Sequence, residues 1–217
     1  MDYETLDVIY KSRQTLLKIL ADRGYNTKPF EKFGPIEISA MAAAGDAAFR
    51  MDLQRPVTEG QRMAYCRVVY SFNNIKNRIV TFLSDQVRDE EDDDTDAIDR
   101  TTTELIVMLT EPVREAFHLA AAAALARNIH VRFFNVQTIV NNPLEHVLVP
   151  KHEFLPSSEH ADFLVKHKIR SKDNLPLIRF HEDMIARIMG LMPGDIVKIT
   201  RPSPSAGEYI SYRLCTA

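Results

Sequence analysis

Residues 104–109, ELIVML, consist of Glu104 and a continuous apolar run that follows it. A run of this length and composition is typical of a β-strand covered on both faces of its sheet. Residues 63–72, MAYCRVVYSF, are β-branched and aromatic and predict a second strand. Residues 129–136, IHVRFFNV, predict a third. The three segments therefore indicate one sheet whose strand over 104–109 is buried.

Helical patterns separate these strands. Residues 75–87 carry apolar side chains at helical spacing, and Pro112 is expected to open an Ala-rich helix, where its missing N–H costs no hydrogen bond. Earlier segments predict a helix over 3–23 with Asp2 and Gly24 as caps, an Ala-rich helix over 36–48 broken by Gly45, and a short strand over 49–54. We therefore expect residues 1–143 to form an α/β domain, a small mixed sheet with flanking helices.

The composition is that of a globular protein. Of 217 residues, 45% are hydrophobic and 26% are charged, which excludes a wholly disordered chain. The longest apolar run, Leu119 to Ala126, has eight residues, whereas a membrane-spanning helix needs roughly 20, so no membrane partner is expected. The polar, periodic N-terminal segment argues against a secretory signal, and two isolated cysteines, Cys66 and Cys215, indicate a reducing, intracellular environment.

Charge is distributed unevenly along the chain. The formal net charge is −3, and residues 89–99, DEEDDDTDAID, contribute eight acids and no base. Like charges at this density repel one another, and little apolar surface is present to anchor the segment. We interpret it as a mobile surface loop rather than as an acidic lure for a basic partner or a mimic of DNA.

A second domain is expected after the breaker sequence that ends at Pro143. Residues 144–217 predict a small α+β domain with a modest core. Its expected elements are a helix from Ser157, as N-cap, to about Lys168, a short helix over 182–189 ended by Gly190, a turn over 192–195, and strands over 196–200 and 209–214 joined by a loop over 201–208. This domain is expected to need contacts with its neighbouring domain or with a partner protein for full stability.

Motifs for catalysis are missing from the sequence. It has no Gly-x-Ser-x-Gly, no phosphate-binding glycine motif, and only seven glycines. Among seven histidines the nearest helical pair is His160 and His167, which lie seven residues apart with no cysteine beside them. Cys66 lies within an apolar strand and is interpreted as a core thiol. We therefore expect no catalytic residue, no metal and no cofactor.

A metal-dependent nuclease is the alternative enzyme hypothesis. Its Mg²⁺ ligands would be Asp52 and Glu104, both on predicted strands. The Glu-x-Lys pattern that would complete such a site is missing, because Leu105 and Ile106 follow Glu104. A free-standing DNA-binding factor is a further alternative, although a slightly negative chain lacks the converging cations that tight binding needs.

Cations and tyrosines gather near the end of the chain. Lys198, Arg201 and Arg213 lie on or between the last two predicted strands, close to Tyr209 and Tyr212. Such a set could contact phosphate. A rigid loop bounded by prolines with one arginine is more typical of a protein–protein contact. We also expect a neutralising cross-strand pair between Lys198 and Glu208.

A series of motifs in residues 148–213 resembles a known family. These motifs are LVPKH at 148–152, Leu175-Pro176, DMIAR at 183–187, Gly190-Leu191, PGDIVKI at 193–199, Arg201-Pro202-Ser203, Ala206-Gly207 and YISYR at 209–213. In order and spacing they resemble the shared small subunit of the nuclear DNA-directed RNA polymerases and its smaller archaeal counterpart. The resemblance covers about 70 residues, and the archaeal protein is similar to this part alone.

The resemblance implies a non-catalytic subunit of DNA-directed RNA polymerase. In that family the C-terminal domain docks on the largest subunit, which implies the largest and other polymerase subunits as partners, with general transcription factors as further candidates. The implied partner-interface residues are Pro150, His152, Pro176, Arg187, Lys198, Arg201, Pro202, Tyr209, Tyr212 and Arg213.

The N-terminal half is similar to the eukaryotic form of the family, in the sequence ADRGY at 21–25 and in the order of its predicted elements. The resemblance implies that residues 1–143 form part of the lower jaw beside downstream duplex DNA, with a fold like that of metal-dependent nucleases but without their site. A turn that approaches DNA in the family corresponds to residues 110–114 here, where Thr110 and Pro112 match it. Arg114 of this turn could approach a phosphate, although the nearby Glu111 would repel it. A nuclear location follows for a cellular protein, and the virion, cytoplasm or nucleus for one from a large DNA virus.

Overall fold

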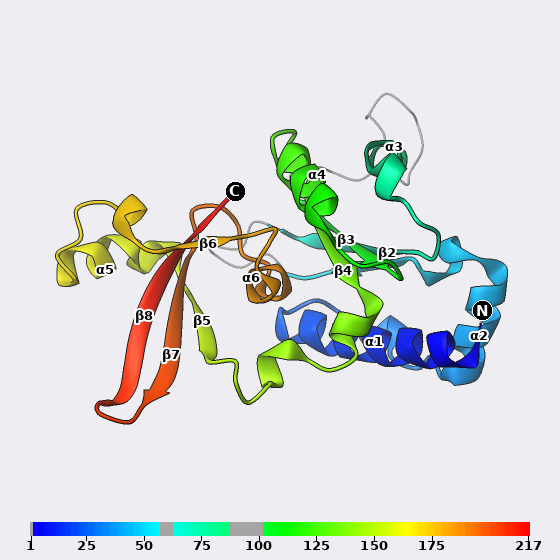
Figure 1. Cartoon of the computed structure of the whole chain (residues 1–217), viewed down its shortest axis with the longest axis horizontal. Coiled ribbons are helices and arrows are strands. Elements are labelled where there is room, and N and C mark those ends of the chain that lie inside the picture. The colour runs from blue at the N-terminus through cyan, green and yellow to red at the C-terminus, as the bar shows by residue number, and fades with distance from the viewer. Residues whose placement is uncertain (1, 57–62, 87–101) are drawn as a thin grey trace. The chain divides into compact units, whose positions relative to one another are not determined.

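The computed structural model describes residues 2–56, 63–86 and 102–217 (Figure 1). The acidic run at 89–99, with its interpretation as a mobile loop, lies outside the described residues. The chain divides into two compact units, Met1–Asn142 and Pro143–Ala217. Both units combine helices with a small mixed sheet. None of the helices in the described ranges is both long enough and apolar enough to cross a membrane.

The first unit contains a four-stranded mixed sheet in the order β1-β2-β3-β4. Strand β1 (Met51–Gln54) pairs antiparallel with β2 (Tyr65–Ser71), whereas β3 (Thr103–Leu109) pairs parallel with β2 and with β4 (His130–Asn135). All seven residues of β3 are buried. The prediction of a strand covered on both faces is therefore confirmed.

Helices cover both faces of this sheet (Figure 1). On one face, α3 (Ile79–Gln86) and α4 (Glu115–Leu125) enclose a core with Leu105, Val107 and Leu109 of β3. The other face is covered by α1 (Tyr3–Asp22), and α2 (Pro35–Ala44) packs beside α1. Short 3-10 helices lie between these elements: η1 (Lys28–Phe30), η2 (Asp46–Phe49), η3 (Lys76–Arg78) and η4 (Val136–Ile139).

The ends of α1 follow from local sequence, as predicted. The Asp2 carboxylate accepts a hydrogen bond from Thr5 N at 3.0 Å and caps the first turn. Gly24 adopts φ +88° after the helix, and its N–H donates to Ala21 O while Tyr25 N donates to Leu20 O. This Schellman arrangement satisfies carbonyls that the helix leaves open.

Two other helix predictions needed correction in the first unit. The helix expected to open at Pro112 begins at Glu115, because Arg114 is extended and takes the N-cap position. The Ala-rich helix expected over 36–48 ends at Ala44 and the chain continues as η2, whereas the predicted break at Gly45 is confirmed by its φ of +105°.

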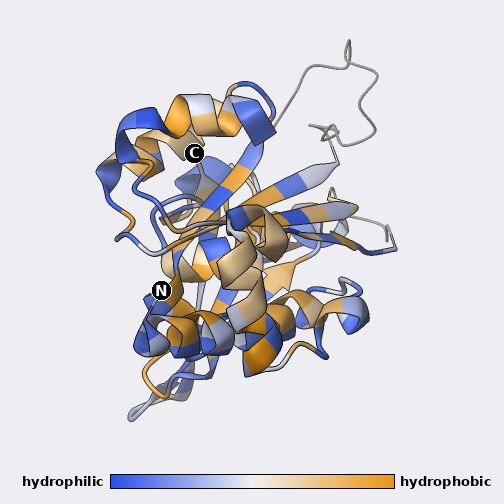
Figure 2. Cartoon of the chain, turned by 90° about the vertical axis from the view of Figure 1, so that its right-hand side faces the viewer, coloured by the Kyte–Doolittle hydropathy of each residue, from blue (hydrophilic) through white to orange (hydrophobic). Residues whose placement is uncertain are grey.

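The second unit contains a mixed sheet in the order β5-β7-β8-β6. Its strands are β5 (Lys151–Leu155), β6 (Leu177–Arg179), β7 (Ile196–Ser203) and β8 (Gly207–Thr216). Its helices are α5 (His160–Lys166) and α6 (Met184–Met189), with 3-10 helices η5 (Pro143–Glu145), η6 (Ser157–Glu159) and η7 (Lys172–Asn174). The core under α5 brings Phe163 against Ile196 and Leu214. Hydrophobic residues occur along helices and strands of both units (Figure 2).

Several predictions for the second unit were wrong in detail. Strands β5 and β6 were not predicted, and β7 and β8 continue through the expected 201–208 loop to the pair Ser203 and Gly207. Pro202 is tolerated in β7 because it lies beyond the last residue that pairs with β5, so one edge of the strand is open there. Ser157 lies inside η6 and makes no cap. Gly190 ends α6 as predicted, in the left-handed conformation.

Candidate functional site

A buried ionic cluster lies between α1 and the first sheet. Glu104 of β3 is fully buried, and its two carboxylate oxygens accept hydrogen bonds from the guanidiniums of Arg23 and Arg132. Arg23 follows the last residue of α1, and its carbonyl accepts a hydrogen bond from Arg55 at 3.1 Å. The cluster therefore joins β3, β4 and the end of α1 through a buried carboxylate, the buried Arg132 and the mostly buried Arg23.

The charges in this cluster determine how its groups titrate. Burial alone would raise the pKa of the Glu104 carboxyl, but the guanidiniums of Arg23 and Arg132 outweigh burial and lower that pKa to about 2. Burial raises the pKa of the neighbouring Cys66 thiol, and the Glu104 charge adds to the effect. Cys66 is 1% exposed, so the prediction of a core thiol is confirmed. A protonated, buried thiol is a poor nucleophile.

The register of the first sheet separates the two carboxylates of the nuclease hypothesis. Asp52 is in register with Arg67 of β2, which is in register with Leu105 of β3. Glu104 of β3 is instead in register with Cys66 of β2. Adjacent positions on a strand point to opposite faces, so Asp52 and Glu104 lie on different faces of the sheet. Asp52 instead contacts two arginines, with Arg67 Nε at 2.7 Å. The hypothesis that Asp52 and Glu104 bind one metal ion together is therefore wrong.

The turn expected to face DNA follows β3. Thr110 donates its hydroxyl to Phe72 O at 3.2 Å, and the Asn135 side chain donates to the carbonyls of Thr110 and Glu111. The Glu111 carboxylate accepts from Ile75 N at 2.7 Å. These bonds fix the turn against the ends of β2 and β4.

Two side chains of this turn remain open to solvent. Pro112 and Arg114 are exposed, and Arg114 precedes the first residue of α4. The carboxylate of the nearby Glu111 is held by its hydrogen bond from the Ile75 backbone. The turn therefore presents one guanidinium on a fixed backbone.

The second sheet sorts the predicted interface residues onto two faces. Residues in register share a face, which places His152, Arg201, Tyr209 and Arg213 on one face, here called the Arg201 face. The Arg201 guanidinium lies 5.2 Å from the centre of the Tyr209 ring, and Arg213 donates to Leu177 O at 3.1 Å. The first of these contacts is a cation–π interaction at an exposed position.

Lys198, Pro202 and Tyr212 lie on the opposite face of the second sheet. Tyr212 packs on Phe163, with ring centres 4.4 Å apart, and so belongs to the core under α5. Lys198 pairs with Glu153 of β5 at 3.3 Å. Its predicted pairing with Glu208 is wrong, because Glu208 is in register with Pro202 instead.

The remaining predicted interface residues are spread over the second unit. Arg187 lies in α6 and is largely buried, with its Nη2 3.6 Å from Met184 Sδ. Pro150 precedes β5 and accepts through its carbonyl from the His152 ring at 2.7 Å. Pro176 is exposed before β6. The structure therefore brings four of the ten residues onto the Arg201 face and disperses the others.

Sequence reasoning missed the most exposed apolar residues of the second unit. Val147 is 94% exposed and Leu148 is 82% exposed, both just before β5. Phe154 is also exposed and belongs to the Arg201 face. Clustered apolar side chains of this kind often mark a protein contact. The unpredicted β5 is the reason that Phe154 was overlooked, since only its register assigns that side chain a face.

The part of the chain that carries the Arg201 face matches a known protein family. The family described as RNA polymerase Rpb5, C-terminal domain, matches residues 141–215. The DNA-directed RNA polymerase subunit Rpo5 of Archaeoglobus fulgidus is 53% identical over 70 residues, which are 32% of this chain and 90% of that protein. The chain belongs to the Rpb5/Rpo5 family of RNA polymerase subunits.

Eukaryotic members of the Rpb5/Rpo5 family match more of the chain at lower identity. The RNA polymerases I, II, and III subunit rpabc1 of Dictyostelium discoideum is 36% identical over 118 residues, which cover 54% of this chain and 59% of that protein. The corresponding Caenorhabditis elegans subunit, RPABC1, is 28% identical over 213 residues, which cover 95% and 94%. The predicted resemblance to this family is therefore confirmed.

Proposed function

We propose that this Rpb5-family chain is a non-catalytic subunit of DNA-directed RNA polymerase in the nucleus. Its second unit docks on the largest polymerase subunit. Its first unit forms part of the lower jaw, near the downstream duplex DNA, in a nuclease-like fold without the nuclease site. General transcription factors are further candidate partners of the assembled complex.

One observation carries this proposal. A match of 70 residues covers 90% of the archaeal subunit Rpo5, and the family description applies to residues 141–215. These residues coincide with the second compact unit, Pro143–Ala217. A segment that suffices as a whole polymerase subunit elsewhere is the natural candidate for the part that assembles with the enzyme.

The surface of the second unit supports a docking role. Arg and Tyr are enriched at the centres of protein interfaces, and the Arg201 face carries the stacked pair of Arg201 and Tyr209. Phe154 adds exposed apolar area to the same face. Val197 and Ile199 of this face are buried, so its exposed part consists of side chains such as Phe154, Arg201 and Tyr209. We therefore propose the Arg201 face as the main docking surface, with Val147 and Leu148 as a second contact.

The first unit has features that suit a position beside DNA without catalysis. The exposed Arg114 could contact a phosphate, and the hydrogen bonds of Thr110 and Asn135 hold its turn in place. Asp52 and Glu104, the carboxylates that a nuclease would use, point to opposite faces and pair with arginines. Both features support a positioning role rather than phosphodiester cleavage.

Affinity purification of the tagged full-length chain tests the docking proposal. We expect wild type to recover the largest polymerase subunit, and Arg201→Glu or Tyr209→Ala to recover much less of it. Lys166→Glu reverses a charge on exposed α5 and is the matched control, which should leave recovery unchanged. Equal recovery with Arg201→Glu and Tyr209→Ala would remove the Arg201 face from the interface, and a wild-type chain that migrates alone would overturn the whole proposal.

Photo-crosslinking within the assembled enzyme tests the jaw proposal. A photoreactive residue in place of Arg114 is expected to crosslink to labelled downstream DNA in a transcribing complex. The same residue in place of Lys18, on α1 at the other face of the first sheet, is the control and should give little crosslink. Equal crosslinking at both positions, or none at Arg114, would contradict the assignment of this turn to the DNA side.

A further inference from the structure

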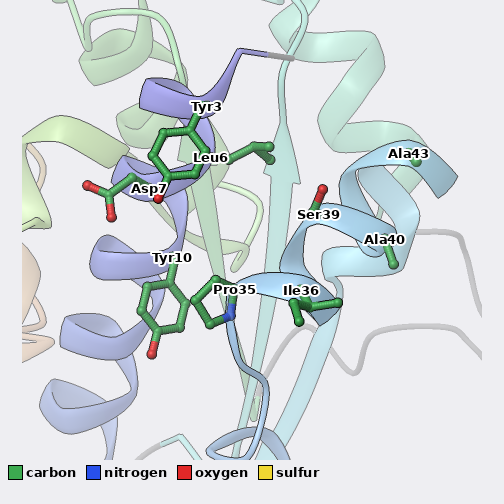
Figure 3. A pocket seen from close by; sticks show the side chains of 9 residues that line it. All are labelled: Tyr3, Leu6, Asp7, Tyr10, Pro35, Ile36, Ser39, Ala40 and Ala43. Carbon is green, nitrogen blue, oxygen red and sulfur yellow. The ribbon is translucent and has the colours of Figure 1, made fainter.

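The first unit has a second surface feature, a groove between α1 and α2 (Figure 3). Its volume is about 610 Å³. The lining residues are Tyr3, Leu6, Asp7 and Tyr10 from α1, and Pro35, Ile36, Ser39, Ala40 and Ala43 from α2. Two of the apolar side chains are strongly exposed, Tyr3 at 87% and Ile36 at 82%. None of these residues takes part in the features proposed above for docking or for DNA.

The composition of α2 indicates that something covers it. Its sequence, PIEISAMAAA, contains one charged residue, Glu37, and most of its residues are hydrophobic. A helix that is apolar on all sides is normally buried. Here Ile38 is the only residue of α2 that is buried by the rest of the described chain. The exposed apolar surface of such a helix is unfavourable in water, and a partner that covered this surface would remove it from water.

The spacing of the lining residues matches the shape of a helix. On α1 they occupy positions 3, 6, 7 and 10, and on α2 positions 36, 39, 40 and 43, so each helix contributes an i, i+3, i+4, i+7 stripe. Such stripes are the surfaces on which a third helix packs. Each stripe spans about two helical turns. The small residues Ser39, Ala40 and Ala43 would allow a partner helix to approach the α2 backbone closely.

The charges around the groove point to the chemistry of the occupant. The charged side chains of residues 2–11 and 34–44 are Asp2, Glu4, Asp7, Lys11 and Glu37, a net side-chain charge of −3. Lys11 is already paired with Asp7 at 2.6 Å. The two helical segments that line the groove are therefore acidic, and Asp7 belongs to the lining itself, which disfavours nucleic acid and favours basic side chains on the partner.

We propose that the groove between α1 and α2 binds an amphipathic α-helix of another protein, whose apolar stripe is flanked by Lys or Arg. The stripe would cover Tyr3, Leu6, Ile36 and Ala40. The basic residues would face Glu4 and its acidic neighbours. This partner contact uses residues of the first unit alone, whereas the proposed docking surface uses residues of the second unit.

Site-specific photo-crosslinking tests this proposal in the assembled complex. A photoreactive residue replaces Ile36 in the tagged full-length chain, and crosslinked peptides are mapped by mass spectrometry. We expect crosslinks to a segment with apolar residues at i, i+3, i+4 and i+7 and flanking Lys or Arg. The same residue at Val80, exposed on α3, is the control and should not crosslink to that segment. Crosslinks to DNA, to a second copy of this chain, to an acidic segment or to nothing would each overturn the proposal.

Binding of a synthetic peptide with the crosslinked sequence provides the quantitative test. Ala40→Glu places a carboxylate in the apolar groove and should weaken binding to the full-length chain by at least about tenfold. Glu4→Lys should also weaken it, whereas Asp85→Lys, an equal charge reversal on α3, should not. Circular dichroism checks that the variants fold, and recovery of the largest polymerase subunit checks assembly independently. Unchanged binding with Ala40→Glu or stronger binding with Glu4→Lys would refute the proposed occupant.

Discussion

Replacing Glu104 by Gln is the sharpest test of how the first unit is stabilised. The substitution keeps the shape of the side chain but removes the charge that Arg23 and Arg132 share. Removing one partner of a buried ion pair typically costs about 3–5 kcal/mol, because a charge is left without compensation. The shift in the pKa of Glu104 gives a free energy of similar size, since a fall from 4.5 to about 2 corresponds to about 3 kcal/mol. We therefore expect Glu104→Gln to lower the free energy of unfolding of the first unit by about 3 kcal/mol at pH 7.

The same reasoning fixes the pH dependence. The pKa of Glu104 is lower in the folded state, so its contribution is fully present above pH 4.5 and is lost as the pH falls towards 2. The difference in stability between wild type and Glu104→Gln should therefore shrink over that range. Urea titrations at several pH values, read by pulsed hydrogen exchange of peptides that contain β3, measure the first unit separately from the second.

A matched control separates this effect from the loss of any carboxylate. Asp52→Asn removes an exposed acid that also contacts two arginines, and an exposed pair contributes only about 0–1 kcal/mol. If Glu104→Gln cost no more than Asp52→Asn, or if its cost were independent of pH between 2 and 4.5, the cluster would not stabilise the fold in the way described.

Three further predictions concern other parts of the chain. Asp183→Ala removes the cap of α6, whose carboxylate accepts from Ile185 N at 2.8 Å, and should destabilise the second unit by about 1 kcal/mol in urea titrations followed by exchange of α6 peptides. Phe117→Ala empties a fully buried position under α4 and should cost the first unit about 3–5 kcal/mol by the same measurement. A thiol reagent should label Cys66 only slowly in the native protein at pH 7, and rapid labelling without denaturant would contradict its burial.

Much of the first unit could be predicted because its signals are local. The apolar run over 104–109 and the Ala-rich segment after Pro112 depend on neighbouring residues alone. The partners of Glu104 could not be predicted, since Arg23 lies 81 residues away in sequence. A carboxylate on an apolar strand therefore suggested a metal ligand, whereas the fold makes it one member of an ionic cluster.

The second unit was harder to predict because two of its strands are short and poorly patterned. Three of the five residues of β5, KHEFL, are charged or polar, and LIR of β6 follows a proline. Without β5, Lys198 had no visible partner except Glu208, although its pair is Glu153. The groove between α1 and α2 was also beyond reach, because the sequence shows that α2 is apolar but not which side the fold leaves uncovered.

The far end of the β7–β8 hairpin has a consequence for how the second unit meets another molecule. Strand β5 pairs only with Ile196–Thr200, so residues 201–203 and 207–209 form a two-stranded ribbon. A ribbon of this kind twists more freely than a wider sheet and should exchange its amide hydrogens first. The ribbon can therefore adjust its shape to a partner surface while the core under α5 keeps its packing. The conformational entropy that the ribbon loses on binding lowers the affinity.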